Sequence, residues 1–255
     1  MQTTRSRTRD LKSFTLELGS GLVTFSFPST HRTRINIPPG SLWRPGGHWH
    51  ESYTEHMRVL HGRVKFTING TAKVIGPEDG VQIIRKYEVH DFCRADGGAG
   101  EGDVTVEEWT EPAQPSPQLS VVGGLFCCWA YLLTHRMEDD GFKQVFFYNV
   151  LSLFKDSLDP NTKKARLSLG LVVQLLTTIA HVDNFVDPLP FLPSTMLALF
   201  AVKYIVTHSV YGFGKVIGSM LGYRVWFEEY TPEELWEVAQ RGPVMQEVLG
   251  REKKE

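Results

Sequence analysis

The sequence predicts an α+β fold in which an antiparallel β-barrel or sandwich is followed by a helical region. Short runs of alternating apolar and polar residues, broken by turn residues, fill residues 14–109 and are typical of half-buried strands. A proline-rich segment, PAQPSPQ, comes next, and beyond it the apolar runs become longer and take on helical spacing. These three observations divide the chain into a β half and a helical half.

The strands of the β half are separated by clear turn signals. Alternation predicts strands at residues 22–27, 63–68, 72–76 and 103–109. Asn69-Gly70 lies between the second and the third and predicts a type I′ hairpin, in which both central residues need positive φ. Many short strands at this spacing indicate a sandwich or a closed barrel.

The domain organisation follows from these shifts in pattern. A basic N-terminal stretch has no apolar run, so we expect it to be a flexible arm. The predicted segments are an arm at 1–13, a barrel at 14–111, a linker at 112–118, a helical region at 119–242 and a charged tail at 243–255.

Composition excludes some classes of function. The chain has 255 residues, of which 42% are apolar, as in globular proteins that bury a core. Its net charge of −2 provides no broad cationic field, so we expect no nucleic-acid partner. Cys93, Cys127 and Cys128 are too few for a disulfide framework and suit a reducing compartment, so we expect a cytoplasmic protein.

The helical half allows two interpretations. Leu167–Val182 and Phe191–Thr207 are apolar runs separated by an acidic, proline-containing loop and flanked by basic residues, which fits a membrane hairpin with both ends in the cytosol. Such a hairpin would attach the protein to an intracellular membrane through residues 167–207. Helices packed on each other or on the barrel would give a similar pattern, and Gln174 and Lys203 within the runs favour that alternative.

The densest chemistry lies in residues 46–62, GGHWHESYTEHMRVLHG. Side chains alternate along a strand, so His48 and His50 point the same way. Glu55 is far enough along the chain to return a carboxylate to the same cavity. Two imidazoles and a carboxylate form the facial set found in non-haem iron oxygenases, and His90 is a candidate fourth ligand. His56 and other histidines have the wrong parity or position.

The spacing His48-x-His50, four residues, Glu55, six residues, Gly62 resembles the first motif of the cupin superfamily. The family's leading glycine falls on Leu42. This resemblance covers residues 21–109 and implies a cupin-type jelly roll that binds one divalent metal ion.

The second cupin motif, Pro-x-Gly-x-x-His, aligns on Arg85, Tyr87 and His90, so only its histidine is retained. The resemblance implies that His90 joins His48, His50 and Glu55 as a metal ligand. Iron(II) is the ion we expect first, and manganese, nickel, copper and zinc also suit this donor set.

The predicted cavity walls are mostly aromatic and apolar, which favours a hydrophobic or aromatic small-molecule substrate over a free sugar. Strand parity nominates five substrate-binding side chains: Phe25, Phe27, Met57, Phe66 and Phe92. Tyr87 is a sixth candidate, as a polar contact, with a structural role as the alternative.

A small cupin barrel followed by a Trp- and Phe-rich helical extension also resembles the cupin-domain oxidoreductases of fungal natural-product clusters, which are associated with oxidative tailoring of polyketides. That resemblance implies a metal-dependent oxidoreductase or oxygenase acting on a small aromatic or polyketide-like molecule in secondary metabolism. Cupins also include redox-neutral isomerases or cyclases, which would use the metal as a Lewis acid, and non-enzymatic ligand-binding proteins. Cupins often dimerise, so a homodimer is a further expectation.

Overall fold

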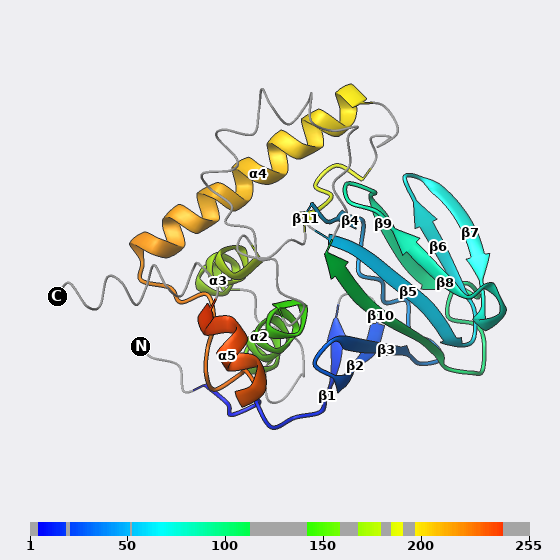
Figure 1. Cartoon of the computed structure of the whole chain (residues 1–255), viewed down its shortest axis with the longest axis horizontal. Helices are drawn as coiled ribbons and strands as arrows, with labels where there is room; N and C mark the ends of the chain where they lie inside the picture. The colour runs from blue at the N-terminus through cyan, green and yellow to red at the C-terminus, as the bar shows by residue number, and fades with distance from the viewer. Residues whose placement is uncertain are drawn as a thin grey trace.

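A computed structural model describes residues 5–18, 21–51, 53–112, 142–158, 168–179, 185–190 and 197–241. Two β-sheets lie together on one side of the molecule, and the helices pack on the other side (Figure 1).

The strands form two antiparallel sheets whose neighbours are not consecutive in sequence. Pairing of β10 between β3 and β5, and of β9 between β4 and β6, requires the chain to cross between the sheets, as it does in a jelly roll. The cupin-type jelly roll predicted from the sequence is therefore confirmed, with the described strands forming two facing sheets rather than a closed barrel. In sheet order, the first sheet contains β1 (Ser13–Leu18), β2 (Gly21–Ser29), β3 (Arg32–Ile37), β10 (Val104–Pro112), β5 (Tyr53–His61) and β8 (Val81–Ile84), and the second contains β11 (Phe185–Val186), β4 (His48–Trp49), β9 (His90–Arg94), β6 (Val64–Ile68) and β7 (Thr71–Ile75).

Local sequence rules account for much of this sheet structure. Each of the four predicted strands is present, with ends shifted by one or two residues on most of them. Asn69 and Gly70, between β6 and β7, have φ values of 48° and 82°, as a type I′ turn requires. The turn at Pro77–Asp79 is a short 3-10 helix.

The helical half contains α2 (Phe142–Asp156), α3 (Leu169–Ile179), α4 (Leu197–Met220) and α5 (Glu233–Arg241). Three long apolar runs of the sequence, at residues 144–154, 167–182 and 195–206, overlap α2, α3 and α4. A fourth apolar run, at 120–133 with Cys127 and Cys128, lies outside the described residues, as does most of the linker. Cys93, on β9, is a free thiol.

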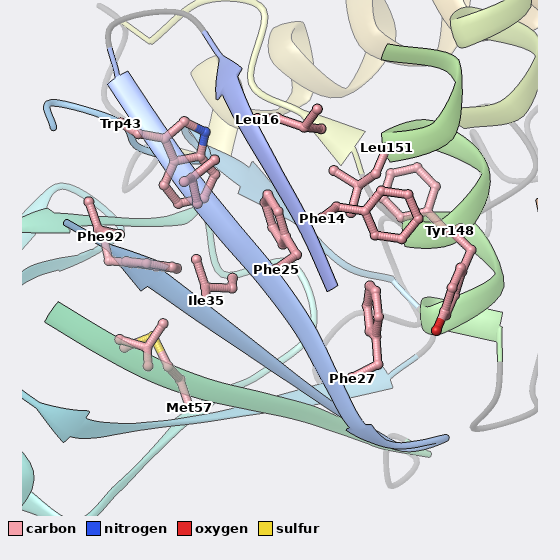
Figure 2. Close-up of a cluster of buried hydrophobic side chains, with 14 of the residues drawn as sticks. Phe14, Leu16, Phe25, Phe27, Ile35, Trp43, Met57, Phe92, Tyr148 and Leu151 are labelled. Carbon is pink, nitrogen blue, oxygen red and sulfur yellow. The ribbon is translucent and has the colours of Figure 1, made fainter. Parts of the chain in front are cut away.

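The jelly roll and the helices share one hydrophobic core. Phe14 and Phe27 point from β1 and β2 toward Tyr148 on α2, while Met57 and Phe92 lie deeper between the sheets (Figure 2). The rings of Phe27 and Tyr148 stack with centroids 4.5 Å apart, and Phe14 meets Tyr148 edge-on at 5.6 Å. Helix α2 therefore covers apolar surface that the sheets would otherwise expose.

Residues 5–12, which fall in the segment expected to be a flexible arm, contact the helical half. Thr8 is fully buried, and its backbone N–H donates to the carbonyl oxygen of Glu229 over 3.0 Å. The carbonyl oxygen of Leu11 accepts a hydrogen bond of 2.8 Å from the Tyr148 hydroxyl. This segment is held on the helical half because its polar backbone and side chains find partners there, which a sequence pattern does not reveal.

Helices α3 and α4, the two runs of the predicted hairpin, pack closely against each other. A Cβ atom at Gly218 on α4 would lie 2.0 Å from Thr177 Oγ1 on α3, and one at Gly214 would lie 2.7 Å from Leu176 Cβ. Only glycine allows this approach of the two backbones. Within the described ranges, no helix combines the length and the apolar character needed to cross a membrane.

Candidate metal centre

The four predicted ligands come together in one cluster. His48, His50, Glu55 and His90 each offer one ligand atom, and these atoms lie within 4.8 Å of one another. Ligands on opposite sides of a single ion with bonds of about 2.0–2.3 Å would be roughly 4–4.6 Å apart. The cluster is therefore close to the size that one metal ion requires.

Strand pairing brings these residues together from distant parts of the sequence. His48 on β4 and His90 on β9 are register neighbours in the second sheet, with ring centroids 4.1 Å apart. His50 follows β4 directly, and the facing sheet supplies Glu55 from β5. The cluster thus lies between the two sheets, with ligands from both.

Backbone carbonyls orient two of the imidazoles. The Nδ1 atom of His48 lies 2.9 Å from the carbonyl oxygen of Gly46, and that of His90 lies 3.0 Å from the carbonyl oxygen of Glu88. A ring nitrogen facing a carbonyl oxygen must carry the proton, so Nε2 has the lone pair in the neutral ring. Metal-binding histidines are oriented in this way by a hydrogen bond from the other ring nitrogen.

One carboxylate oxygen lies between two of the rings. Glu55 Oε2 is 2.8 Å from His50 Nε2 and 3.1 Å from His90 Nε2. When His90 Nδ1 carries the proton and donates to Glu88, His90 Nε2 has a lone pair. This lone pair then faces Glu55 Oε2, which is also an acceptor. Either a proton or a metal cation must lie between such groups, so this arrangement of donor atoms fits a bound cation.

Burial strengthens the case for a cation. His50, Glu55 and His90 are 2–3% exposed, whereas His48 is half-buried. Burial lowers the pKa of His48 well below its usual value, and the neighbouring His90 and His50 lower it further. A buried carboxylate is costly unless a positive charge compensates it. Three nitrogen donors and one oxygen donor suit a divalent transition metal.

The turn before His90 has a positive φ at the position where the second cupin motif has glycine. Tyr87 occupies that position with a φ of 65°, in the left-handed region that glycine favours. Its backbone N–H donates to the carbonyl oxygen of His50 over 2.7 Å. This bond connects the turn that precedes one ligand to the residue that provides another.

Three of the predicted substrate-binding residues lie on strands that carry a ligand or pair with one that does. Met57 shares a face of β5 with Glu55, and Phe92 shares a face of β9 with His90, because each is two residues along its strand. Phe66 on β6 is the register partner of Phe92. All three are almost completely buried.

The other three predicted substrate-binding side chains, Phe25, Phe27 and Tyr87, contact the helical half. Phe25 meets Trp43 edge-on and Phe147 on α2, and Phe27 stacks on α2 as described above. The ring of Tyr87 packs edge-on against Phe200 of α4. Contact between substrate and any of the six side chains stays a prediction.

Two features of the site had no counterpart in the sequence analysis. The carbonyls of Gly46 and Glu88 orient the rings, and β11, from the helical half, pairs with the ligand strand β4. Carbonyl orientation depends on the local backbone, and pairing of β11 depends on tertiary folding. The only signal for β11 was the Phe185-Val186 pair within an otherwise turn-like loop.

Sequence comparison finds two fungal relatives, whereas a scan against models of protein families finds no match. "Oxidoreductase OpS7" of Beauveria bassiana (strain ARSEF 2860) is 24% identical over 207 residues, covering 78% of this chain and 60% of that protein. "Probable oxidoreductase patJ" of Penicillium expansum is 26% identical over 220 residues, covering 84% and 53% respectively. The chain therefore spans only about half to three fifths of the length of these curated relatives.

Structural comparison returns jelly-roll proteins with low overall scores. A predicted oxalate decarboxylase from Thermotoga maritima aligns with 42% of this chain and 97% of its own, at 22% identity and a TM-score of 0.32. The cupin domain of Cnp3 from Schizosaccharomyces pombe aligns with 42% and 73%, at 14% identity and a TM-score of 0.28. The chain thus combines a cupin-type jelly roll and a buried cluster of three histidines and one glutamate with sequence similarity to two fungal oxidoreductases.

Proposed function

We propose that this chain is a metal-dependent cupin oxidoreductase or oxygenase that acts on a small aromatic or polyketide-like molecule in secondary metabolism. The observation that carries the proposal is the convergence of His48, His50, Glu55 and His90 on a site between the two sheets. The similarity to two fungal proteins named as oxidoreductases supports a redox reaction over isomerisation, cyclisation or simple ligand binding.

The four side chains would hold one divalent ion, for which we propose iron(II). Such an ion supplies redox chemistry and the activation of dioxygen, which protein side chains alone do not provide. Glu55 contributes the one negative charge of the set and compensates part of the charge of the ion. The half-buried His48 marks the accessible side of the cluster, from which we propose that the substrate approaches.

The surroundings of the cluster support an apolar substrate. Met57, Phe66 and Phe92 form a buried apolar layer beside the ligands, which would exclude water and favour an aromatic or aliphatic group. The ring of Tyr53 stacks on that of His50 at 4.5 Å and restricts the orientation of this ligand.

Oxygen uptake tests the proposed reaction. The metal-free protein would be loaded with iron(II) without air and mixed with a panel of hydroxylated aromatic compounds of polyketide type. We expect oxygen consumption that requires both iron and substrate, that is lost in His50→Ala, and that is kept in His56→Ala, because His56 stacks on Trp109 outside the cluster. Turnover without oxygen uptake, equally fast with zinc, would instead show the redox-neutral isomerase or cyclase.

A further inference from the structure

The strand that carries His48 is short and has little pairing within the jelly roll. Within the described part of the chain, β4 pairs with β9 at one position, His48 with His90. It pairs with β11 at two positions, His48 with Val186 and Trp49 with Phe185. More of its backbone pairing therefore comes from the helical half than from the jelly roll.

The hydrogen bonds between these segments continue beyond β11. The backbone N–H of Asp187 donates to the carbonyl oxygen of Gly47 over 2.7 Å. A Cβ atom at Gly47 would lie 3.4 Å from Asp187 Cβ, so the two segments are in close contact. Residues 185–187 thus line the edge of β4 along residues 47–49.

Helix α4 holds this segment from the other side. Lys203, Thr207 and Tyr211 are spaced by four residues, so they lie on one face of the helix. Lys203 Nζ lies 2.6 Å from Asp187 Oδ2, in an ion pair whose side chains are 1% and 4% exposed. The Thr207 hydroxyl donates to the carbonyl oxygen of Val186 over 3.4 Å, and the Tyr211 hydroxyl accepts from the N–H of Val186 over 3.2 Å.

A second face of α4 contacts the ligand strand through aromatic rings. Trp49, between the two histidines of the motif, is fully buried and meets Phe200 edge-on at 5.6 Å. Its indole N–H donates to Glu51 Oε1 over 3.1 Å, and His208 Nε2 on α4 lies 3.2 Å from the same oxygen. Both ends of the His48–His50 segment are therefore in contact with elements of the helical half.

We propose that α4 is a positioning element of the metal centre, with Lys203 and Tyr211 as positioning residues that hold β11 against β4 and so fix His48 and His50. This inference rests on the proposed function, because it assigns a role toward the metal. A buried ion pair contributes little net stability in general, so the proposal depends on where the Lys203–Asp187 pair lies, next to β4, and not on its energy. Residues that do not bind the metal but orient its ligands affect metal affinity strongly.

Metal affinity in variants of the two positioning residues tests the proposal. Cobalt(II) affinity would be measured by competition with a chelator in wild type, Lys203→Met and Tyr211→Phe. We expect Lys203→Met to bind about 10- to 100-fold more weakly, and Tyr211→Phe, which removes one hydroxyl, to show a smaller loss. Asn149→Ala is the matched control, because Asn149 is equally buried in the helical half but bonds to Thr231 and Phe227. It should keep the wild-type affinity.

Hydrogen exchange in the metal-free protein gives a second readout that does not depend on metal. We expect faster exchange of the amides at residues 47–49 in Lys203→Met and Tyr211→Phe, with unchanged exchange in β6 and β7. Wild-type cobalt affinity and wild-type exchange in both variants would overturn the proposal. A wild-type protein that binds no metal would overturn the proposed function instead, and the exchange rates would still decide whether α4 holds β4.

Discussion

The backbone N–H of Tyr87 donates to the carbonyl oxygen of His50, although Tyr87 occupies a position at which the cupin motif has glycine. The bond is 2.7 Å long, and Tyr87 itself has a left-handed backbone with a φ of 65°. Tyr87 thus adopts a positive φ, which glycine favours, and its ring packs against Phe200 of α4.

The strain at Tyr87 predicts an unusual order of stability among its variants. Tyr87→Gly and Tyr87→Val both lose the ring contact, but only glycine adopts a positive φ without steric cost. A β-branched residue in this conformation costs about 1–3 kcal/mol. We expect Tyr87→Val to be less stable than Tyr87→Gly by about that amount in urea denaturation. Equal unfolding free energies would show that the turn does not require this conformation.

Close packing of α3 on α4 predicts a steric clash that a second substitution relieves. Gly218→Ala would place a methyl group 2.0 Å from Thr177 Oγ1 and 2.9 Å from Thr177 Cβ. Overpacking of this kind costs about 1–3 kcal/mol. Combining Gly218→Ala with Thr177→Ala, which removes Oγ1 and Cγ2 but keeps Cβ, should recover part of the loss in a double-mutant cycle. Simple additivity of the two changes would contradict the close contact.

Tyr148 predicts a loss of stability in alkaline solution. Burial, with a smaller effect from Glu234, raises the pKa of Tyr148 to about 12, against about 10 in an unfolded chain. Because the pKa is higher in the folded state, the stability due to this group is complete below about pH 10 and is lost as the pH rises toward about 12. Wild type should therefore lose more unfolding free energy than Tyr148→Phe between about pH 9 and about pH 11. Parallel losses would contradict this assignment.

Much of the jelly roll and of the grouping of His48, His50 and Glu55 was predictable, because both depend on short-range rules. Alternation along a strand placed His48 and His50 on one side, and the spacing to Glu55 allowed the chain to return to the same cavity. The Asn69-Gly70 turn was predictable for the same reason, since it requires positive φ at adjacent residues.

The contribution of the helical half was not predictable, because it depends on contacts between residues far apart in sequence. Lys203 appeared in the sequence as a charge within an apolar run, and only the folded chain brings it to Asp187 behind β4. Thr8 lies in a basic segment that resembles a free arm, yet its buried hydroxyl contacts that of Ser152 on α2. No local pattern marks either contact.

Titration of the metal-free chain with cobalt(II), followed by visible absorption, tests the central claim most directly. We predict one tightly bound ion per chain in wild type and in His56→Ala, whose ring lies outside the cluster. Replacement of His48, His50 or His90 by alanine, or Glu55→Gln, should weaken binding and change the spectrum, because each removes or alters a ligand. Wild-type affinity and an unchanged spectrum in His50→Ala and Glu55→Gln would show that the ion is not held between these sheets.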